Sequence, residues 1–238
     1  MIGLESGKVQ VASYDPAWKD AFKAETDSLR TALQEIAATV VIEHVGSTAV
    51  EGLASKPIID VALGFKTLAD MRRGLALLVE SGRDYVKAAN QPGMLFMAKG
   101  EDGRRSFHYH LVVYGTPAWR KLVVFRDYLR RHPGVASEYG DLKTELATAH
   151  PESRAKYMAR KRPALRAIMQ RGFAENARRR HAAAIALSLS LADEETALTE
   201  WQRLRRAEAN APDAPAVSAP VDGSGDDELE DFEPQAEA

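Results

Sequence analysis

The stretch His44–Asp60 reads H-V-G-S-T-A-V-E-G-L-A-S-K-P-I-I-D, and the rest of the chain is interpreted outward from it. It continues a β-branched run that predicts a buried strand ending at Gly46 and Ser47. Thr48 and Glu51 match the capping-box pattern, so we expect a helix to begin beside Gly46. Glycine lets a phosphate approach the backbone, and a helix start offers N–H donors to an anion. The stretch therefore predicts a phosphate-binding loop.

Asp60 lies inside the apolar segment Ile58–Leu63, which predicts a second strand. An ionised carboxylate in an apolar strand costs free energy unless a metal ion or another cation meets it. Asp60 is therefore a candidate site residue, with the alternative that it only caps a turn near the strand end. Lys56 adds a positive charge to the loop that precedes this strand.

A second polar feature belongs to a predicted hairpin with its turn at 100–103. His108 and His110 are two residues apart in the second strand of the hairpin, so their side chains project from one face. If this strand lies beside the strand of Asp60, the three side chains can bind one metal ion or contact one phosphate. The alternative is two polar residues on the solvent face of an antiparallel sheet. Lys99, near the end of the facing strand, adds positive charge.

Helical patterns precede and follow these strands. Asp15 and Pro16 predict a helix start, and Thr67 with Asp70 forms a second capping box. Beyond the hairpin the pattern is helical, with a stop predicted at His132–Pro133. Strands that alternate with helices in this way predict an α+β fold, with a mixed β-sheet and helices packed on it.

Several motifs in a fixed order identify a family resemblance. They are Y-D-P-A-W at 14–18, the stretch at 44–60, F-H-Y-H-L-V-V-Y at 107–114, F-R-D-Y-L-R at 125–130 and a helical stretch to about Phe173. In these motifs the chain resembles the GrpB family, a branch of the nucleotidyltransferase superfamily. The resemblance covers about three quarters of the chain. It implies a nucleotidyltransferase-like domain in residues 1–175.

The resemblance also implies a chemistry, namely metal-dependent transfer of a nucleotidyl group from a nucleoside triphosphate to an unknown acceptor. Gly46 and Ser47 would hold the triphosphate, with Thr48, Lys56 and Lys99 as further phosphate contacts. Carboxylates of the superfamily bind one or two divalent cations, here Mg²⁺ with Mn²⁺ or Zn²⁺ as alternatives. Asp60 matches the first of these carboxylates.

The chain departs from the superfamily pattern at Ala62, where a second carboxylate is usual. His108 and His110 would supply the missing ligands, with His110 also a candidate catalytic residue beside Asp60. Imidazole suits zinc, manganese or iron better than magnesium, so a one-metal phosphoester hydrolase is a second hypothesis. A non-catalytic nucleotide-binding or partner-binding module is the third, because the lost carboxylate fits it as well.

The composition limits the size of the fold and the classes of chemistry that are possible. The chain has 238 residues, 45% of them hydrophobic, which suffices for one sizeable core. It has no cysteine, so disulfides, thiolate zinc sites and cysteine nucleophiles are excluded. No apolar run approaches the roughly 20 residues that span a bilayer, and no signal segment is evident, so we expect a cytoplasmic protein without membrane contact.

Charge is distributed unevenly along the chain. Residues 211–238 hold nine acidic and no basic residues, which leaves 32 basic against 25 acidic residues in the first 210. We expect a helical extension at 176–210 and a disordered acidic tail at 211–238. This tail can fold back over a basic site of the folded part and compete weakly with an anionic ligand. Residues 154–180 contain ten basic residues and a single acidic one, Glu175. This pattern is compatible with nucleic-acid binding but is more typical of a solvated helix face. The oligomeric state is not predicted.

Overall fold

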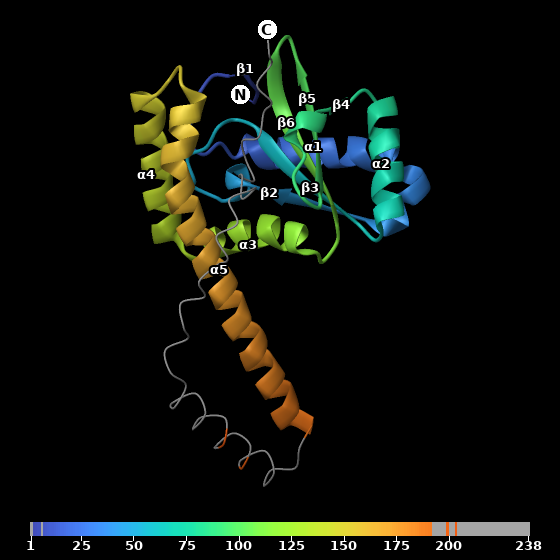
Figure 1. Ribbon diagram of the computed structural model, residues 1–238, viewed down its shortest axis with the longest axis vertical. Helices are drawn as coiled ribbons and strands as arrows, with labels where there is room; N and C mark the ends of the chain where they lie inside the picture. The colour runs from blue at the N-terminus through green and yellow to red at the C-terminus, as the bar shows by residue number, and fades with distance from the viewer. Residues whose placement is uncertain (1, 6, 192–198, 200–202, 204–238) are drawn as a thin grey trace. The chain divides into compact units, whose positions relative to one another are not determined.

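The computed structural model describes residues 2–5, 7–191, 199 and 203, and within them one sheet of six strands is formed (Figure 1). The strand order is β2-β3-β6-β5-β4, with the short β1 paired to β6. β3 and β6 run parallel, and the other pairs are antiparallel. The strands are β1 (Leu4–Glu5), β2 (Val40–Val45), β3 (Ile59–Phe65), β4 (Asp84–Tyr85), β5 (Met94–Glu101) and β6 (Arg104–Val113).

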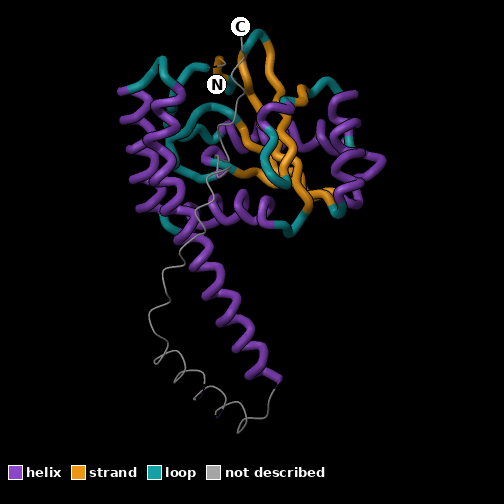
Figure 2. The backbone as a smooth tube through the Cα atoms, in the orientation of Figure 1, coloured by secondary structure: helices purple, strands orange, loops and turns teal. Residues whose placement is uncertain are grey.

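Helices cover both faces of this sheet (Figure 2), which confirms the predicted α+β class. One face packs against α1 and α2, and the other packs against α3, α4 and the first part of α5. The helices are α1 (Ala17–Ala32), α2 (Leu68–Glu80), α3 (Pro117–Arg131), α4 (Pro133–Ala149) and α5 (Arg154–Leu191), with single 3₁₀ segments at Gln34–Thr39, Ser47–Ala49 and Lys87–Ala89. None of the described helices combines the length and hydrophobicity that a bilayer crossing requires.

β3 is buried along its whole length and β6 is buried from Phe107 to Val112. In β3 this burial on both faces explains the nearly continuous apolar sequence. Because side chains alternate along a strand, each strand divides its residues between two cores. Val61 and Tyr109 belong to the core under α1 and α2. Ala62 and Val112 belong to the core under α3, α4 and α5. Polar residues at the even positions of these strands therefore lie on the second face.

Three predicted local signals are confirmed. The Thr67 hydroxyl accepts a hydrogen bond from the Asp70 N–H, and the Asp70 carboxylate accepts one from the Thr67 N–H, so the capping box that starts α2 is complete. The predicted hairpin is formed by β5 and β6. The helix stop at His132–Pro133 is also present, because α3 ends at Arg131 and α4 begins at Pro133.

The capping box predicted at Thr48 and Glu51 was wrong. The chain makes only one 3₁₀ turn, Ser47–Ala49, without a side-chain cap, and Val50 is already extended. The Thr48 hydroxyl hydrogen-bonds the His44 ring at 3.0 Å, and Glu51 pairs with Lys19 at 2.8 Å. Both side chains therefore have other partners, and the loop offers no helix N-terminus to an anion.

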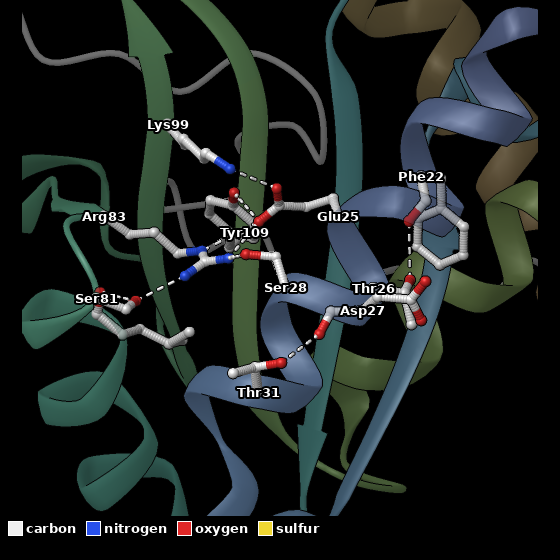
Figure 3. Close-up of polar contacts among 11 residues, drawn as sticks. Phe22, Glu25, Thr26, Asp27, Ser28, Thr31, Ser81, Arg83, Lys99 and Tyr109 are labelled. Atoms are coloured by element: carbon white, nitrogen blue, oxygen red, sulfur yellow. Dashed lines mark hydrogen bonds and ion pairs between the residues drawn. The ribbon is translucent and has the colours of Figure 1, made fainter.

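A buried polar network joins α1, the chain after α2 and the sheet on the first face (Figure 3). One carboxylate oxygen of Glu25 accepts hydrogen bonds from Arg83 Nη2 at 2.5 Å and from the Tyr109 hydroxyl at 2.8 Å. The other accepts from Lys99 Nζ at 2.6 Å. Glu25 and Arg83 are almost fully buried. Burial raises the pKa of Glu25, but the bonds from Lys99 and Arg83 outweigh it and hold that pKa below its ordinary value.

Replacing Glu25 with alanine is expected to lower the free energy of unfolding by about 3–5 kcal/mol, because Arg83 is left as a buried charge without its carboxylate partner. Urea unfolding followed by circular dichroism measures the loss. Glu80→Ala, an exposed residue at the end of α2, is the control and should change stability by less than about 0.5 kcal/mol. Equal effects of the two substitutions would show that the network contributes little.

The first compact unit of the fold extends to Gly172, inside α5. A Cβ at Gly172 would come within 2.8 Å of Val124 Cγ1, so this residue lets α5 approach α3 closely. Residues 173–191 of α5 belong to a second unit. The acidic segment 211–238 and most of the predicted extension after 191 lie outside the described residues.

Candidate functional site

The loop after β2 lies directly against Asp60. Val45, the last residue of β2, is the register partner of Asp60 in β3, and Gly46 follows with φ +70°. A Cβ at Gly46 would be 2.5 Å from Asp60 Oδ2 and 2.9 Å from Asp60 Cβ. Both the positive φ and the close approach require glycine at this position. The backbone of the Gly46–Ser47 bend is therefore held at van der Waals distance from the carboxylate.

The two histidines reach the same carboxylate from the neighbouring strand. β6 pairs with β3 so that His108 lies opposite Asp60 and His110 lies opposite Ala62. His110 Nε2 is 2.9 Å from Asp60 Oδ1, and His108 Nδ1 is 3.5 Å from the same oxygen. The exposed fractions of Asp60, His108 and His110 are 4%, 2% and 1%. The two histidines lie on one face, as their spacing predicts, and the parallel pairing of β3 with β6 adds Asp60 to that face. The chemical roles of the three residues stay predictions.

The charge on this group follows from its contacts. Burial raises the pKa of Asp60, but hydrogen bonds and charge interactions with His108 and His110 outweigh burial and hold that pKa below its ordinary value. An ionised Asp60 can only accept hydrogen bonds, so His110 Nε2 carries the proton and donates it to Oδ1. His110 Nδ1 is buried without a hydrogen-bond partner among the described residues. An imidazole oriented by a carboxylate, with its second nitrogen unpartnered, is arranged as a general base.

The predicted three-ligand metal centre does not fit this arrangement. Both imidazoles approach a single oxygen of Asp60, and His110 is hydrogen-bonded to it rather than turned toward a shared point. Within the described part of the chain, no three or more His, Asp or Glu side chains are arranged to hold a metal ion. Mg²⁺ also prefers oxygen ligands, and Asp60 offers the only carboxylate of the three. Metal binding by Asp60, His108 and His110 therefore stays a prediction that this geometry does not support.

Of the predicted phosphate contacts, Ser47 and Lys56 lie on the face of the sheet that holds Asp60, whereas Lys99 lies on the opposite face. Ser47 Oγ accepts a hydrogen bond from Lys143 Nζ at 2.7 Å. Lys56 lies over the Tyr157 ring, with Nζ 5.4 Å from its centroid, near the same loop. The prediction that Lys99 contacts phosphate was wrong. Lys99 is the register partner of Phe107, so its side chain projects from the opposite face of the sheet. Its ammonium group binds Glu25 there and cannot serve a ligand beside Asp60.

Lys143 was missed by the sequence reasoning. It lies on α4 between Tyr139 and Leu146, with an exposed fraction of only 1%. A lysine on the apolar stripe of an amphipathic helix was the available signal, because lysine is almost never fully buried without a partner. The sequence gives no indication, however, that this stripe faces Ser47.

Two arginines of α3 fix the position of the loop. Arg126 Nη1 donates to the His44 carbonyl at 3.0 Å and to Glu43 at 2.7 Å, and Arg130 Nε donates to the Ala49 carbonyl at 2.9 Å. His44 itself stacks on Phe22 of α1 at 4.7 Å between ring centroids. Burial lowers the pKa of His44 to about 4, so the ring is neutral at pH 7.

This pKa gives a pH dependence of stability. Because the folded-state pKa of His44 lies below its unfolded value of 6.5, the unfolded chain binds the proton more tightly. The contribution of the neutral His44 ring to the free energy of unfolding is fully present above pH 6.5. It is lost as the pH falls toward 4, which lowers the free energy of unfolding by up to about 3 kcal/mol. Urea unfolding at pH 7, 6 and 5 measures it, and His44→Gln should flatten the slope between pH 6.5 and 4.5. An unchanged slope in this variant would assign the effect to other groups.

Comparisons with known proteins support a family assignment. The family model described as GrpB protein matches residues 8–171. The UPF0157 protein YqkA of Bacillus subtilis is 32% identical over 63% of this chain, but the match covers only 43% of YqkA. The crystal structure of GrpB from Enterococcus faecalis is 32% identical and covers 70% of this chain and 99% of that one, with a TM-score of 0.64. A structure of the Cid1 poly(U) polymerase with MgGTP bound matches at 15% identity over 58% of this chain and 44% of that one, with a TM-score of 0.42. Since the family model spans more than half of the residues and includes the loop, Asp60 and both histidines, the chain belongs to the GrpB protein family.

Proposed function

We propose that this protein transfers a nucleotidyl group from a nucleoside triphosphate to an acceptor hydroxyl. The observation that carries the proposal is the contact of the Gly46 bend with Asp60, which is also hydrogen-bonded to His110. A backbone bend with a serine hydroxyl is suited to a phosphate group, and an oriented imidazole is suited to proton removal. Nucleotidyl transfer requires phosphate binding and proton removal from the attacking hydroxyl at the same phosphorus atom. The family resemblance carried by residues 44–60 supports the same chemistry.

In the proposed reaction each group has one role. The triphosphate, with the divalent cation that accompanies it as part of the substrate, lies along the Gly46–Ser47 bend. The acceptor oxygen attacks the α-phosphorus and forms the new P–O bond, while the bond to the β-phosphate oxygen breaks and pyrophosphate leaves. His110 Nδ1 takes the proton of the acceptor hydroxyl. Asp60 holds the His110 ring in position and stabilises the imidazolium that forms.

A non-catalytic nucleotide-binding module is the second candidate, and Ala62 favours it. This residue is fully buried opposite His110, at the position where the superfamily pattern places a second carboxylate. A module that binds a nucleotide without reacting needs the loop but not that carboxylate. The one-metal hydrolase is not carried further, because the three side chains it requires do not converge as metal ligands.

A thermal-shift screen tests nucleotide binding, which both candidates require. Nucleoside triphosphates with Mg²⁺ or Mn²⁺ should raise the melting temperature by roughly 5–10 °C at a hundredfold excess over the dissociation constant. Incubation of a stabilising triphosphate, labelled at the α-phosphate, with candidate acceptors then separates transfer from binding alone. If no triphosphate stabilises the protein with any cation, both candidates fail.

A further inference from the structure

The two edge strands of the sheet differ strongly in length. β4, at one edge, has only two residues, Asp84 and Tyr85, and both are exposed. β2, at the other edge, has six residues and keeps a regular register with β3 along all of them. Edge strands in proteins are usually short or carry lysine, proline or a bulge, because an open edge can pair with another strand. β4 fits this description, whereas β2 has none of these features.

The register of β2 with β3 shows which backbone groups of β2 face away from the sheet. The Lys66 N–H donates to the Thr39 carbonyl at 2.9 Å, so these two residues extend the β2–β3 register as a hydrogen-bonded pair. Hydrogen-bonded and non-hydrogen-bonded pairs alternate along antiparallel strands. Val40 and Ile42 are therefore non-hydrogen-bonded positions, and their N–H and C=O groups point outward from the edge.

Arg126 of α3 agrees with this alternation and limits the open part of the edge. Its Nη1 donates to the carbonyl of His44, the next outward position, at 3.0 Å, and to Glu43 at 2.7 Å. The outward side of β2 is thus occupied at His44. It is open at Val40 and Ile42, which form no hydrogen bond on that side with any residue in the described part of the chain.

Val41 lies between these two open positions and has an exposed fraction of 39%. Its register partner in β3 is Gly64, which has no side chain to cover it. Because side chains alternate along a strand, Val41 projects toward the face of α3, while Val40 and Ile42 pack against the core under α1 and α2. Residues 40–42 therefore present an exposed apolar side chain together with unpaired backbone donors and acceptors.

The segment 40–42 is complementary to a second copy of itself. A two-fold axis at Val41 places Val40 of one copy opposite Ile42 of the other, and each such pair exchanges two backbone hydrogen bonds. The two Val41 side chains then meet at a non-hydrogen-bonded position, where opposing side chains lie closest. Glu43 falls opposite Thr39, so this register opposes no like charges.

We propose that two copies of this protein associate through β2, in an antiparallel pair centred on Val41 that joins their sheets into one. The inference does not depend on nucleotidyl transfer. Three residues from each copy form a small interface, because Arg126 stops the ladder at His44. An interface well below roughly 1,000 Å² is typical of weak association, so we expect a dissociation constant of about 10–100 μM.

Sedimentation velocity of the full chain over about 1–500 μM measures the association. Wild-type protein should change from monomer to dimer across this range. Val41→Lys should stay monomeric, because two ammonium groups would then oppose each other across the axis. The matched control is Val79→Lys on α2. Val79 is also an exposed valine, with an exposed fraction of 47%, and its variant should dimerise as the wild type does.

Two further measurements test the register. Val41→Glu alone should be monomeric, whereas an equimolar mixture with Val41→Lys should form heterodimers, because opposite charges then meet at the axis. Amide hydrogen exchange followed by NMR reports on the backbone. The N–H groups of Val40 and Ile42 should exchange rapidly in dilute wild-type protein and slowly in concentrated protein, while the N–H of Val41, which faces β3, stays protected at both concentrations.

The inference is overturned if wild-type protein remains monomeric at about 500 μM. It is also overturned if folded Val41→Lys dimerises as the wild type does, or if dimerisation leaves the exchange of Val40 and Ile42 unchanged. Circular dichroism shows whether each variant is folded. If Val41→Lys does not fold, hydrogen exchange of the wild type decides the question. Dimerisation is measured without nucleotide, so its failure and the failure of the proposed function are distinguishable.

Discussion

Asp60→Asn is expected to lower nucleotidyl transfer by about 10²- to 10⁴-fold while nucleotide binding changes little. Asparagine has nearly the same shape but no charge. It therefore no longer stabilises the imidazolium form of His110, whose Nε2 lies 2.9 Å from the carboxylate oxygen. The substitution leaves the Gly46–Ser47 bend unaltered, so the proposed contacts to phosphate remain.

Single-turnover kinetics with an α-labelled triphosphate measures the rate, and a thermal-shift titration measures nucleotide binding in the same variant. Asp84→Asn is the matched control, because Asp84 is exposed on β4, the opposite edge strand of the sheet from β2. It should retain the full rate. If Asp60→Asn binds and transfers as the wild type does, Asp60 has no catalytic role.

Gly46→Ala should abolish measurable nucleotide binding and lower the free energy of unfolding by roughly 2–4 kcal/mol. Two effects add at this position. The φ of +70° is unfavourable for alanine, and the new methyl group would lie 2.5 Å from Asp60 Oδ2. The bend must move away from β3, which changes both the loop and the carboxylate that it contacts.

Gly52→Ala separates these effects, because Gly52 has φ +80° but nothing within 4 Å of its Cβ position. It carries the backbone strain alone and should cost about 1 kcal/mol without loss of nucleotide binding. Urea unfolding and thermal-shift titration of both variants give the comparison. Equal behaviour of the two alanine variants would show that the contact with Asp60 is unimportant.

The period of two in strands was sufficient to place His108 and His110 on one face, and the apolar context was sufficient to mark Asp60. The sequence analysis could only assume that the strand of the histidines lies beside the strand of Asp60, because the order of strands in a sheet depends on contacts between distant parts of the chain. The parallel pairing of β3 with β6 supplies it. The same rule would have excluded Lys99 if the hairpin register had been known, since Lys99 lies opposite Phe107 on the other face.

Local patterns failed where a competing partner was distant in sequence or unrecognised. The Thr48–Glu51 pattern was present, but His44 and Lys19 bind these side chains and no helix follows. Lys143 could not be assigned to the site because α4 is separated from Ser47 by almost one hundred residues of chain. Helix packing, which sequence periodicity does not specify, decides that contact.

The position of β6 between β3 and β5 has a consequence for synthesis on the ribosome. The β2–β3 hairpin can form as soon as it emerges, but Asp60 then lies on an open edge in contact with water. The carboxylate gains its imidazole neighbours only when β6 has been translated and inserted, and α4 and α5 follow later still. A nascent chain therefore brings Asp60 and its imidazoles together before the three helices that cover this face have been synthesised.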